Sequence, residues 1–289
     1  MDLPVASVLR PETLDRALEL LHADPPPVPV SGGTDLVVQL RAGRRSAPVL
    51  LDLSRLPLDG IREEGGVVAV GATATMDAIA ASPLVREAAP ALAEAAGRVG
   101  AWPIQCRATL GGNLANASPA ADTAPPLIAA GAELLLASAW GRRTVPVESF
   151  FTGPGRTVLE PGELILEVRV PHLSRTPGDR AVDRFAKLGP RREQIISVVS
   201  LALRSGITAS GALEGCRIAV GSVAATPVRA RNAEAVLEGR TPSEAVRREA
   251  ARALQRDIAP IDDVRAPARY RRIAAAVMLD RLLGEVAGG

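Results

Sequence analysis

Residues 104–126 hold the densest group of side chains that could bind a ligand. Gly111 and Gly112 remove two side chains in succession, which lets a ligand approach the backbone and permits a positive φ. Polar groups surround them on Thr109, Asn113, Asn116, Ser118 and Asp122. Because exposed N–H groups of a glycine-rich turn can hold an anion, this chemistry suits a phosphate or pyrophosphate. Short glycine pairs also occur in ordinary solvent-exposed turns, so the interpretation depends on the rest of the chain.

A second glycine pair lies earlier, in Ser31-Gly32-Gly33-Thr34-Asp35. An apolar strand is expected before it at 28–30 and a helix after it at 36–41. In a strand–turn–helix unit the N-terminus of the helix points N–H groups at an anion. The segment is not the GxGxxG dinucleotide fingerprint, because the third glycine is absent.

Composition excludes several classes of protein. A chain of 289 residues is long enough for about two domains. A net charge of +2 gives no electrostatic argument for binding nucleic acid. Cys106 and Cys216 share no CxxC spacing, and two cysteines are too few to hold a 2Fe–2S cluster. Only His22 and His172 could supply imidazole, which argues against a His-based metal site or a Ser-His-Asp triad. No signal peptide or membrane-spanning run is visible, so we expect a cytoplasmic protein without integral membrane contact.

The hydrophobic pattern predicts a mixed chain of helices and strands. Residues 148–157 are expected to form a loop, and the polar stretch 171–179 to separate two domains. After it, strands followed by helices predict an α+β second domain. The expected helices are 11–22, 36–41, 76–81, 84–99 (divided or bounded by Pro90), 230–237, 243–255 and 270–283. The expected strands are 28–30, 49–53, 67–70, 164–170, 184–189, 195–203 and 216–223.

The two glycine pairs together resemble the FAD-binding subunit of the molybdenum-containing hydroxylases, the family of xanthine dehydrogenase and the aerobic CO dehydrogenases. The resemblance continues in order along essentially the whole chain. It is carried by 116–122 (NASPAAD), 150–155 (FFTGPG), 161–165 (PGELI), 185–192 (FAKLGPRR), 221–229 (GSVAATPVR) and 270–272 (YRR).

The resemblance implies an α+β fold in two parts. The first is an FAD-binding domain (PCMH-type) at 1–174, made of two α/β subdomains at about 1–56 and 57–174. The second is a small α+β domain at 180–286, of the CO dehydrogenase flavoprotein C-terminal type. The FAD is expected to be noncovalent, because neither His22 nor His172 lies in the glycine turns.

The resemblance also implies which residues hold the cofactor. It gives no catalytic side chain and no metal ligand in this chain. Asp122 corresponds to a carboxylate near the cofactor, Ile165 to an apolar contact, and Lys187, the only lysine, to a cation near the flavin. The pyrophosphate would be held largely through backbone N–H groups by Val30, Ser31, Gly32, Gly33, Thr34, Asp35, Thr109, Leu110, Gly111, Gly112 and Asn113, with Asn116 beside them.

Two positions depart from the family's pattern. Cys106 stands where relatives often carry Asn, and we expect a buried, inert thiol there. Gln194-Ile195 follows Arg191-Arg192-Glu193 where some relatives have acidic residues. In animal-type xanthine dehydrogenases this loop lies near the flavin ring, so the change could alter the flavin potential or the choice of electron acceptor, and the use of NAD is less secure than FAD binding.

The function implied is electron transfer within a larger enzyme. A large partner subunit with the molybdenum cofactor would oxidise the substrate, a small 2Fe–2S subunit would relay electrons, and FAD in this chain would pass them to NAD. A dimer of heterotrimers is expected, and xanthine dehydrogenase is the nearest subtype. The alternatives are a hydroxylase acting on CO, nicotinate or an aldehyde with oxygen or a quinone as acceptor, a stand-alone flavin oxidoreductase, or a cofactor-free scaffold.

Overall fold

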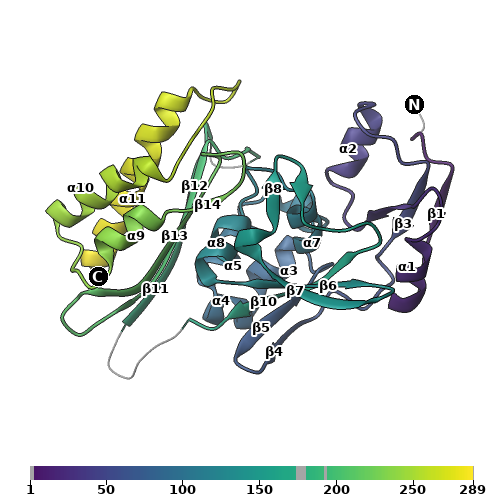
Figure 1. Ribbon diagram of the computed structural model, residues 1–289, viewed down its shortest axis with the longest axis horizontal. Helices are drawn as coiled ribbons and strands as arrows, with labels where there is room; N and C mark the ends of the chain where they lie inside the picture. Colours follow the sequence, from purple (N-terminus) through teal and green to yellow (C-terminus); the bar gives the residue numbers. More distant parts are fainter. Residues whose placement is uncertain (1–2, 174–179, 192–193, 289) are drawn as a thin grey trace.

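A computed structural model describes residues 3–173, 180–191 and 194–288. Its three main sheets follow one another along the molecule, and helices separate the second sheet from the third (Figure 1). The fold is the expected mixture of helices and strands. Most of the expected linker at 171–179 lies outside the described residues, as do Arg192 and Glu193.

The N-terminal subdomain is built on a small parallel sheet in the order β1-β3-β2. Thr13 begins the first helix by accepting the N–H of Arg16 at 3.3 Å, and the leucine spacing after it buries Ala17 and Leu18 against the sheet. The elements are β1 (Ser7–Leu9), α1 (Leu14–Leu20), β2 (Val28–Val30), α2 (Leu36–Arg41) and β3 (Val49–Asp52).

The second subdomain is built on a five-stranded antiparallel sheet in the order β4-β5-β10-β6-β7. Its strands are β4 (Ile61–Glu64), β5 (Val67–Gly71), β6 (Glu133–Ser138), β7 (Gly141–Pro146) and β10 (Leu164–Pro171). Its helices are α3 (Met76–Ala81), α4 (Pro83–Ala88), α5 (Pro90–Ala96), α6 (Trp102–Gln105), α7 (Leu110–Ala115) and α8 (Ala124–Ala130). The helical stretch expected at 84–99 is divided at Pro90, because the residue before a proline disfavours the helical conformation.

The stretch expected as a loop at 148–157 contains regular structure. It forms η1 (Val147–Ser149) and a short hairpin of β8 (Phe151–Gly153) and β9 (Arg156–Thr157). Phe150 and Phe151 are both buried, with their rings edge to face and centroids 5.3 Å apart. Burying two aromatic rings here fixes the backbone, which explains the error in the prediction.

The C-terminal domain is an antiparallel sheet in the order β11-β12-β13-β14, followed by helices. Its elements are β11 (Arg180–Leu188), β12 (Val199–Ile207), β13 (Leu213–Gly221), β14 (Val228–Arg229), α9 (Arg231–Leu237), α10 (Glu244–Ala253), η2 (Leu254–Arg256) and α11 (Ala268–Gly288). The strand expected at 195–203 begins only at Val199. The residues before it bind the preceding domain instead: Gln194 donates its N–H to the Gly100 carbonyl at 3.1 Å.

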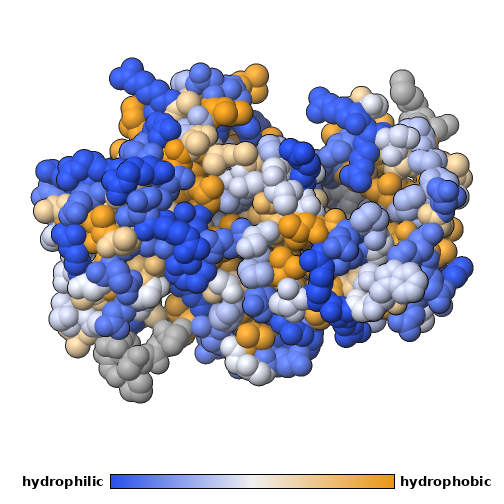
Figure 2. Space-filling model, in the orientation of Figure 1, coloured by the Kyte–Doolittle hydropathy of each residue, from blue (hydrophilic) through white to orange (hydrophobic). Residues whose placement is uncertain are grey.

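This last sheet is covered on both faces, as Figure 1 shows. Side chains alternate along a strand, so Leu201 and Leu203 face α9–α11 while Ala202 joins the core of the preceding domain. Phe185 of β11 also belongs to this core. Helix α5 packs against β11, and α8 packs against the neighbouring strands β12 and β13. The outer face of the C-terminal helices is largely hydrophilic (Figure 2). Among the described helices, none is long and apolar enough to cross a bilayer.

Candidate cofactor-binding site

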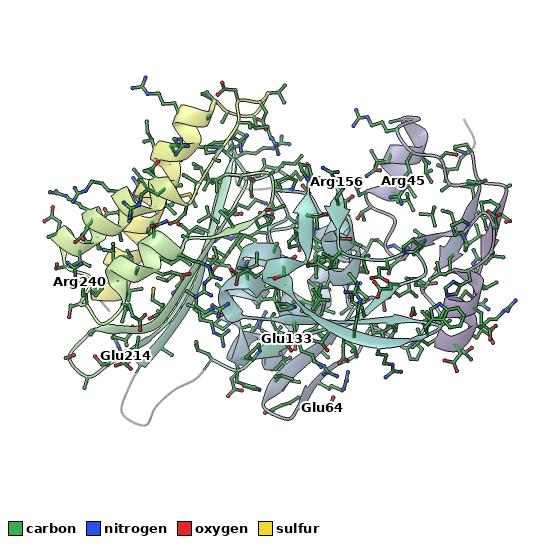
Figure 3. All side chains as sticks on the ribbon, in the orientation of Figure 1. Arg45, Glu64, Glu133, Arg156, Glu214 and Arg240 are labelled. Atoms are coloured by element: carbon green, nitrogen blue, oxygen red, sulfur yellow. The ribbon has the colours of Figure 1, made fainter. Side chains whose placement is uncertain are left out.

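A cavity of about 710 Å³ lies between the two subdomains of the first domain. One wall is the loop between β2 and α2, the opposite wall is α7, and the segments at 21–30 and 159–163 close it. Arg45, just after α2, lines it from the N-terminal side (Figure 3). The volume falls within the roughly 300–1,000 Å³ of small-molecule and cofactor sites.

The β2–α2 loop offers a run of free backbone donors. The N–H groups of residues 31–35 donate no hydrogen bond to any described residue. Ser31, Gly33, Thr34 and Asp35 line the cavity. Gly33 has φ of +70°, a left-handed conformation that favours glycine. Successive free N–H groups ahead of a helix form an anion-binding concavity, so this loop suits a phosphate group.

Gly32 allows the two walls to meet. A Cβ atom on this residue would lie 1.9 Å from the carbonyl oxygen of Arg107. A second cavity of about 230 Å³, lined by Gly32 and Cys106 among others, adjoins this crossing. The glycine is required because two backbones touch, and no side chain of any size would fit between them.

The second glycine pair differs from the prediction. Gly111 and Gly112 do not form a turn with positive φ; they lie in the first turn of α7. Thr109 begins this helix and accepts the N–H of Gly112 at 3.3 Å, while the N–H groups of Leu110 and Gly111 donate to carbonyls of residues 74 and 72. Because these donors already have partners, they are not free to hold an anion, unlike the N–H groups of the first glycine loop.

The two glycines of α7 have separate structural roles. A Cβ on Gly111 would lie 2.8 Å from the Cβ and the carbonyl oxygen of Ala72, so this glycine lets α7 pack against the end of β5. Gly112 is exposed and lines the cavity, and a Cβ there would approach only the hydroxyl of Thr109, at 2.9 Å. Gly111 therefore positions α7, and Gly112 leaves space for a ligand.

Side-chain amides on α7 complete the polar part of the cavity. Asn113 and Asn116 are both half-buried and line it. The oxygen of Asn113 accepts the hydroxyl of Thr123 at 2.6 Å, and the oxygen of Asn116 accepts Gln39 at 3.4 Å. Gln39 lies on α2 and also bonds Asp35 at the start of that helix, so its bond to Asn116 links α2 to the end of α7.

The structure thus brings together most, but not all, of the expected site residues. Leu110 is buried on the packed side of α7, and Ile165 is buried in the core of the second subdomain. Neither these two nor Gly111, Asp122 and Lys187 line either cavity. Val30, Ser31, Gly33, Thr34, Asp35, Thr109, Gly112, Asn113 and Asn116 line the main cavity.

Asp122 and Lys187 form a buried ion pair between the two domains. Nζ of Lys187 lies 2.6 Å from a carboxylate oxygen of Asp122, and both side chains are less than a tenth exposed. The same ammonium donates to the Arg98 carbonyl at 2.9 Å, and the Ser197 hydroxyl donates to Asp122 at 2.5 Å. Burial raises the pKa of Asp122, and the charge of Lys187 opposes that shift. In this structure the lysine holds the domains together.

Several cavity residues were not identified from the sequence. His22 lines the cavity and packs beside Trp140, with ring centroids 5.5 Å apart. His22 therefore lies at the site although it is outside both glycine pairs in the sequence. Arg45 had no distinguishing signal, since it is one of many arginines in the chain.

The wall at 159–163 is held by a bidentate ion pair. Arg143 donates to both oxygens of Glu163, at 2.6 and 2.7 Å, and also to the Val158 carbonyl at 2.8 Å. The guanidinium lowers the pKa of Glu163, whose side chain is 7% exposed. Glu163 also accepts the N–H of Glu160, which fixes the turn that faces the cavity.

The two cysteines have different surroundings. Cys106 is half-buried and lines the smaller cavity, so the expectation of a buried thiol is wrong. Cys106 lies beside the contact between Gly32 and Arg107, and one side of the residue faces the smaller cavity. Cys216 is buried, and burial raises the pKa of its thiol to about 12, which keeps it protonated and unreactive.

The fold and the cavity define a protein that binds a phosphate-bearing cofactor. The free N–H groups of 31–35 match an anion, the open side of Gly112 leaves room for it, and the cavity also includes the segments at 21–30 and 159–163. These features fit an extended dinucleotide such as FAD.

Comparisons with known proteins identify the family. Residues 4–173 match the family "FAD binding domain in molybdopterin dehydrogenase", and residues 184–286 match "CO dehydrogenase flavoprotein C-terminal domain". The carbon monoxide dehydrogenase medium chain of Hydrogenophaga pseudoflava is 33% identical over 255 residues, covering 88% of this chain and 87% of that one. The putative xanthine dehydrogenase FAD-binding subunit of Escherichia coli K12 is 29% identical, covering 98% of each.

A solved structure agrees with the sequence matches. A chain of carbon monoxide dehydrogenase from H. pseudoflava superposes with a TM-score of 0.90 at 32% identity, covering 97% of this chain and 96% of that one. The chain belongs to the FAD-binding medium subunits of the molybdenum hydroxylases, which are oxidoreductase subunits.

Proposed function

We propose that this chain binds FAD noncovalently in the cavity between its subdomains and serves as the electron outlet of a xanthine dehydrogenase-like molybdenum hydroxylase. When bound, FAD supplies the redox chemistry, taking electrons from a partner 2Fe–2S subunit and giving them to NAD. The observation that carries the proposal is the loop at 31–35, whose five N–H groups are free of partners among the described residues.

The chain's own residues bind and orient the cofactor. The loop at 31–35 holds the pyrophosphate, Gly112 leaves space for it, and the amides of Asn113 and Asn116 add donors from the other side. Asp122, Lys187 and Ile165 act on the site from behind the cavity, by fixing the C-terminal domain and the core.

The acceptor is tested by anaerobic reduction. Full-length chain is loaded with FAD, desalted and mixed with NADH in the absence of partners, and the flavin absorbance is followed. We expect NADH to bleach the flavin bands. If NADH leaves the absorbance unchanged while dithionite bleaches it, NAD is not the acceptor.

A second candidate is the same role in a hydroxylase with another substrate and with oxygen or a quinone as acceptor. The 33% identity to a carbon monoxide dehydrogenase medium chain favours it. Rapid reoxidation of dithionite-reduced chain by a soluble quinone, without reaction with NADH, would support this candidate.

The proposed partners are a small 2Fe–2S subunit and a large subunit with the molybdenum cofactor, in a dimer of heterotrimers. The relatives are medium chains of multi-subunit enzymes, which supports the existence of a small and a large partner subunit. Co-expression with the neighbouring genes, followed by measurement of mass in solution, tests the stoichiometry.

A further inference from the structure

The Thr123 hydroxyl is fully buried and has one partner among the described residues. Its Oγ1 lies 2.6 Å from the side-chain oxygen of Asn113, and Thr123 is 0% exposed. A buried hydroxyl must donate its hydrogen, because an unsatisfied polar group away from water is costly. The oxygen of Asn113 is the acceptor, which fixes which end of the amide points toward Thr123.

The orientation of the Asn113 amide follows from this contact. If the amide were reversed, its nitrogen would face the threonine oxygen and the buried hydroxyl hydrogen would have no acceptor. With the oxygen held by Thr123, the amide nitrogen and its two hydrogens are directed to the open side. Asn113 lines the cavity, and its nitrogen has no partner among the described residues.

The side-chain amide of Asn116 is oriented in the same way, with its oxygen held by a donor. Nε2 of Gln39 donates to the oxygen of Asn116 at 3.4 Å, which leaves the nitrogen of that amide free as well. Asn113 lies on α7 and Asn116 directly follows it, opposite the free N–H groups of 31–35, and the two walls touch at Gly32. This part of the cavity therefore holds donors on both sides and matches a group with many oxygen acceptors.

Thr123 is held in place by the C-terminal domain. Its neighbour Asp122 is bound by Lys187 and by the Ser197 hydroxyl, at 2.6 and 2.5 Å. Earlier in the same loop, the Pro119 carbonyl accepts the N–H of Ser222 at 2.8 Å. The loop that carries Thr123 cannot move without breaking a buried ion pair, so the hydroxyl is a rigid support.

We propose that Thr123 is a positioning residue that fixes the Asn113 amide so that its nitrogen donates to the pyrophosphate of the bound dinucleotide. The inference rests on the proposed function. It assigns to the buried threonine a role in ligand affinity beyond its contribution to packing.

The test measures affinity of the full-length apoprotein for FAD, and for ADP by competition. Thr123→Val keeps the shape and removes the hydroxyl, so we expect it to weaken both ligands about tenfold. Thr123→Ser keeps the hydroxyl and should restore affinity relative to Thr123→Val. In an Asn113→Ala background, Thr123→Val should have no further effect, since a residue that acts through Asn113 needs it. Thr208→Val, which removes a hydroxyl from the distant β12–β13 turn, is the matched control.

The outcomes separate this inference from the proposed function. If the wild-type chain binds no FAD, alone or with its partner subunits present, both fail. If it binds FAD but Thr123→Val binds as tightly, or weakens FAD equally with and without Asn113, the positioning role is wrong and the proposed function stands. If FAD weakens while ADP does not, the acceptor is not the pyrophosphate and the inference is overturned. Unfolding midpoints of all variants identify any loss that comes from misfolding.

Discussion

The buried pair between Lys187 and Asp122 gives the sharpest prediction about stability. Lys187→Met removes the ammonium but keeps a side chain of similar length. It leaves the Asp122 carboxylate almost fully buried, with the Ser197 hydroxyl as its remaining side-chain donor and the Arg98 carbonyl without the ammonium. Removing one partner of a buried pair costs about 3–5 kcal/mol, because the other charge is stranded. We expect the free energy of unfolding to fall by about that amount.

A double-mutant cycle isolates the pair. In Lys187→Met with Asp122→Asn, no charge is stranded, so most of the loss should be recovered, giving a coupling energy of about 2 kcal/mol or more. The assay is urea unfolding of the full chain at pH 7, followed by circular dichroism. Arg16→Met is the control: it breaks an ion pair whose side chains are about 60% exposed and should cost under about 0.5 kcal/mol.

The same variant predicts a dependence on pH. In Lys187→Met the pKa of Asp122 in the folded state is raised further above the unfolded value of 3.8, because burial acts without the opposing charge. Stability is then lost as pH rises through the folded pKa, so the deficit should shrink below pH 4. Additive single effects, or a deficit that stays constant down to acidic pH, would refute the reasoning that a stranded carboxylate causes the loss.

Three further predictions concern other parts of the chain. Gly32→Ala should reduce FAD affinity by about 100-fold or more and lower the unfolding midpoint, because its Cβ would overlap a backbone carbonyl at 1.9 Å; flavin titration measures it. Asp183→Asn should flatten the stability profile between pH 4 and 6: burial raises the folded pKa of Asp183 to about 6, so wild type loses stability as pH rises through this range. Arg143→Met should loosen the cavity wall, costing about 1–3 kcal/mol at pH 7. The pKa of Glu163 is lowered in the folded state, so the cost should begin to shrink below the unfolded value of 4.5 and disappear as pH falls through the folded pKa.

Each of these has a control or a contrary result. Gly60→Ala has open space around the new methyl group and an ordinary φ, so it should bind FAD normally. Equal losses in Gly32→Ala and Gly60→Ala would mean that the crossing of the two loops is not what matters. A pH profile of Asp183→Asn parallel to wild type would show that this carboxyl does not titrate differently on folding. Unchanged stability of Arg143→Met at neutral pH would remove the argument for the bidentate pair.

The sequence predicts the elements well where the hydrophobic pattern is strong. The leucines of 14–21 give a helix, and the alternation around Phe185 gives a strand, because both depend on local periodicity. The same alternation places Asp183, Phe185 and Lys187 on one face of β11. What covers that face could not be predicted, since α5 and α8 belong to the preceding domain and reach it only through tertiary packing.

The glycine pairs show where a motif is ambiguous. Both read as turns, but Gly111 is helical because it packs on Ala72, and that contact is distant in sequence. Only in the structure is it visible that Gly32 meets the carbonyl of Arg107. Likewise His22 lies far from either pair in sequence and still lines the cavity. A single sequence specifies residue types and spacing, and the approach of separate backbones comes from the fold.

The central claim is that the cavity between the subdomains binds one noncovalent FAD. The direct measurement is a visible absorption spectrum of the purified full-length chain after incubation with FAD and desalting, followed by acid precipitation. The account predicts about one flavin per chain, released on precipitation, and little flavin retained by Gly112→Trp, whose side chain would fill the open side of α7. Retention by Gly112→Trp equal to wild type, flavin that stays with the precipitated chain, or no flavin bound even in the presence of the partner subunits would contradict it.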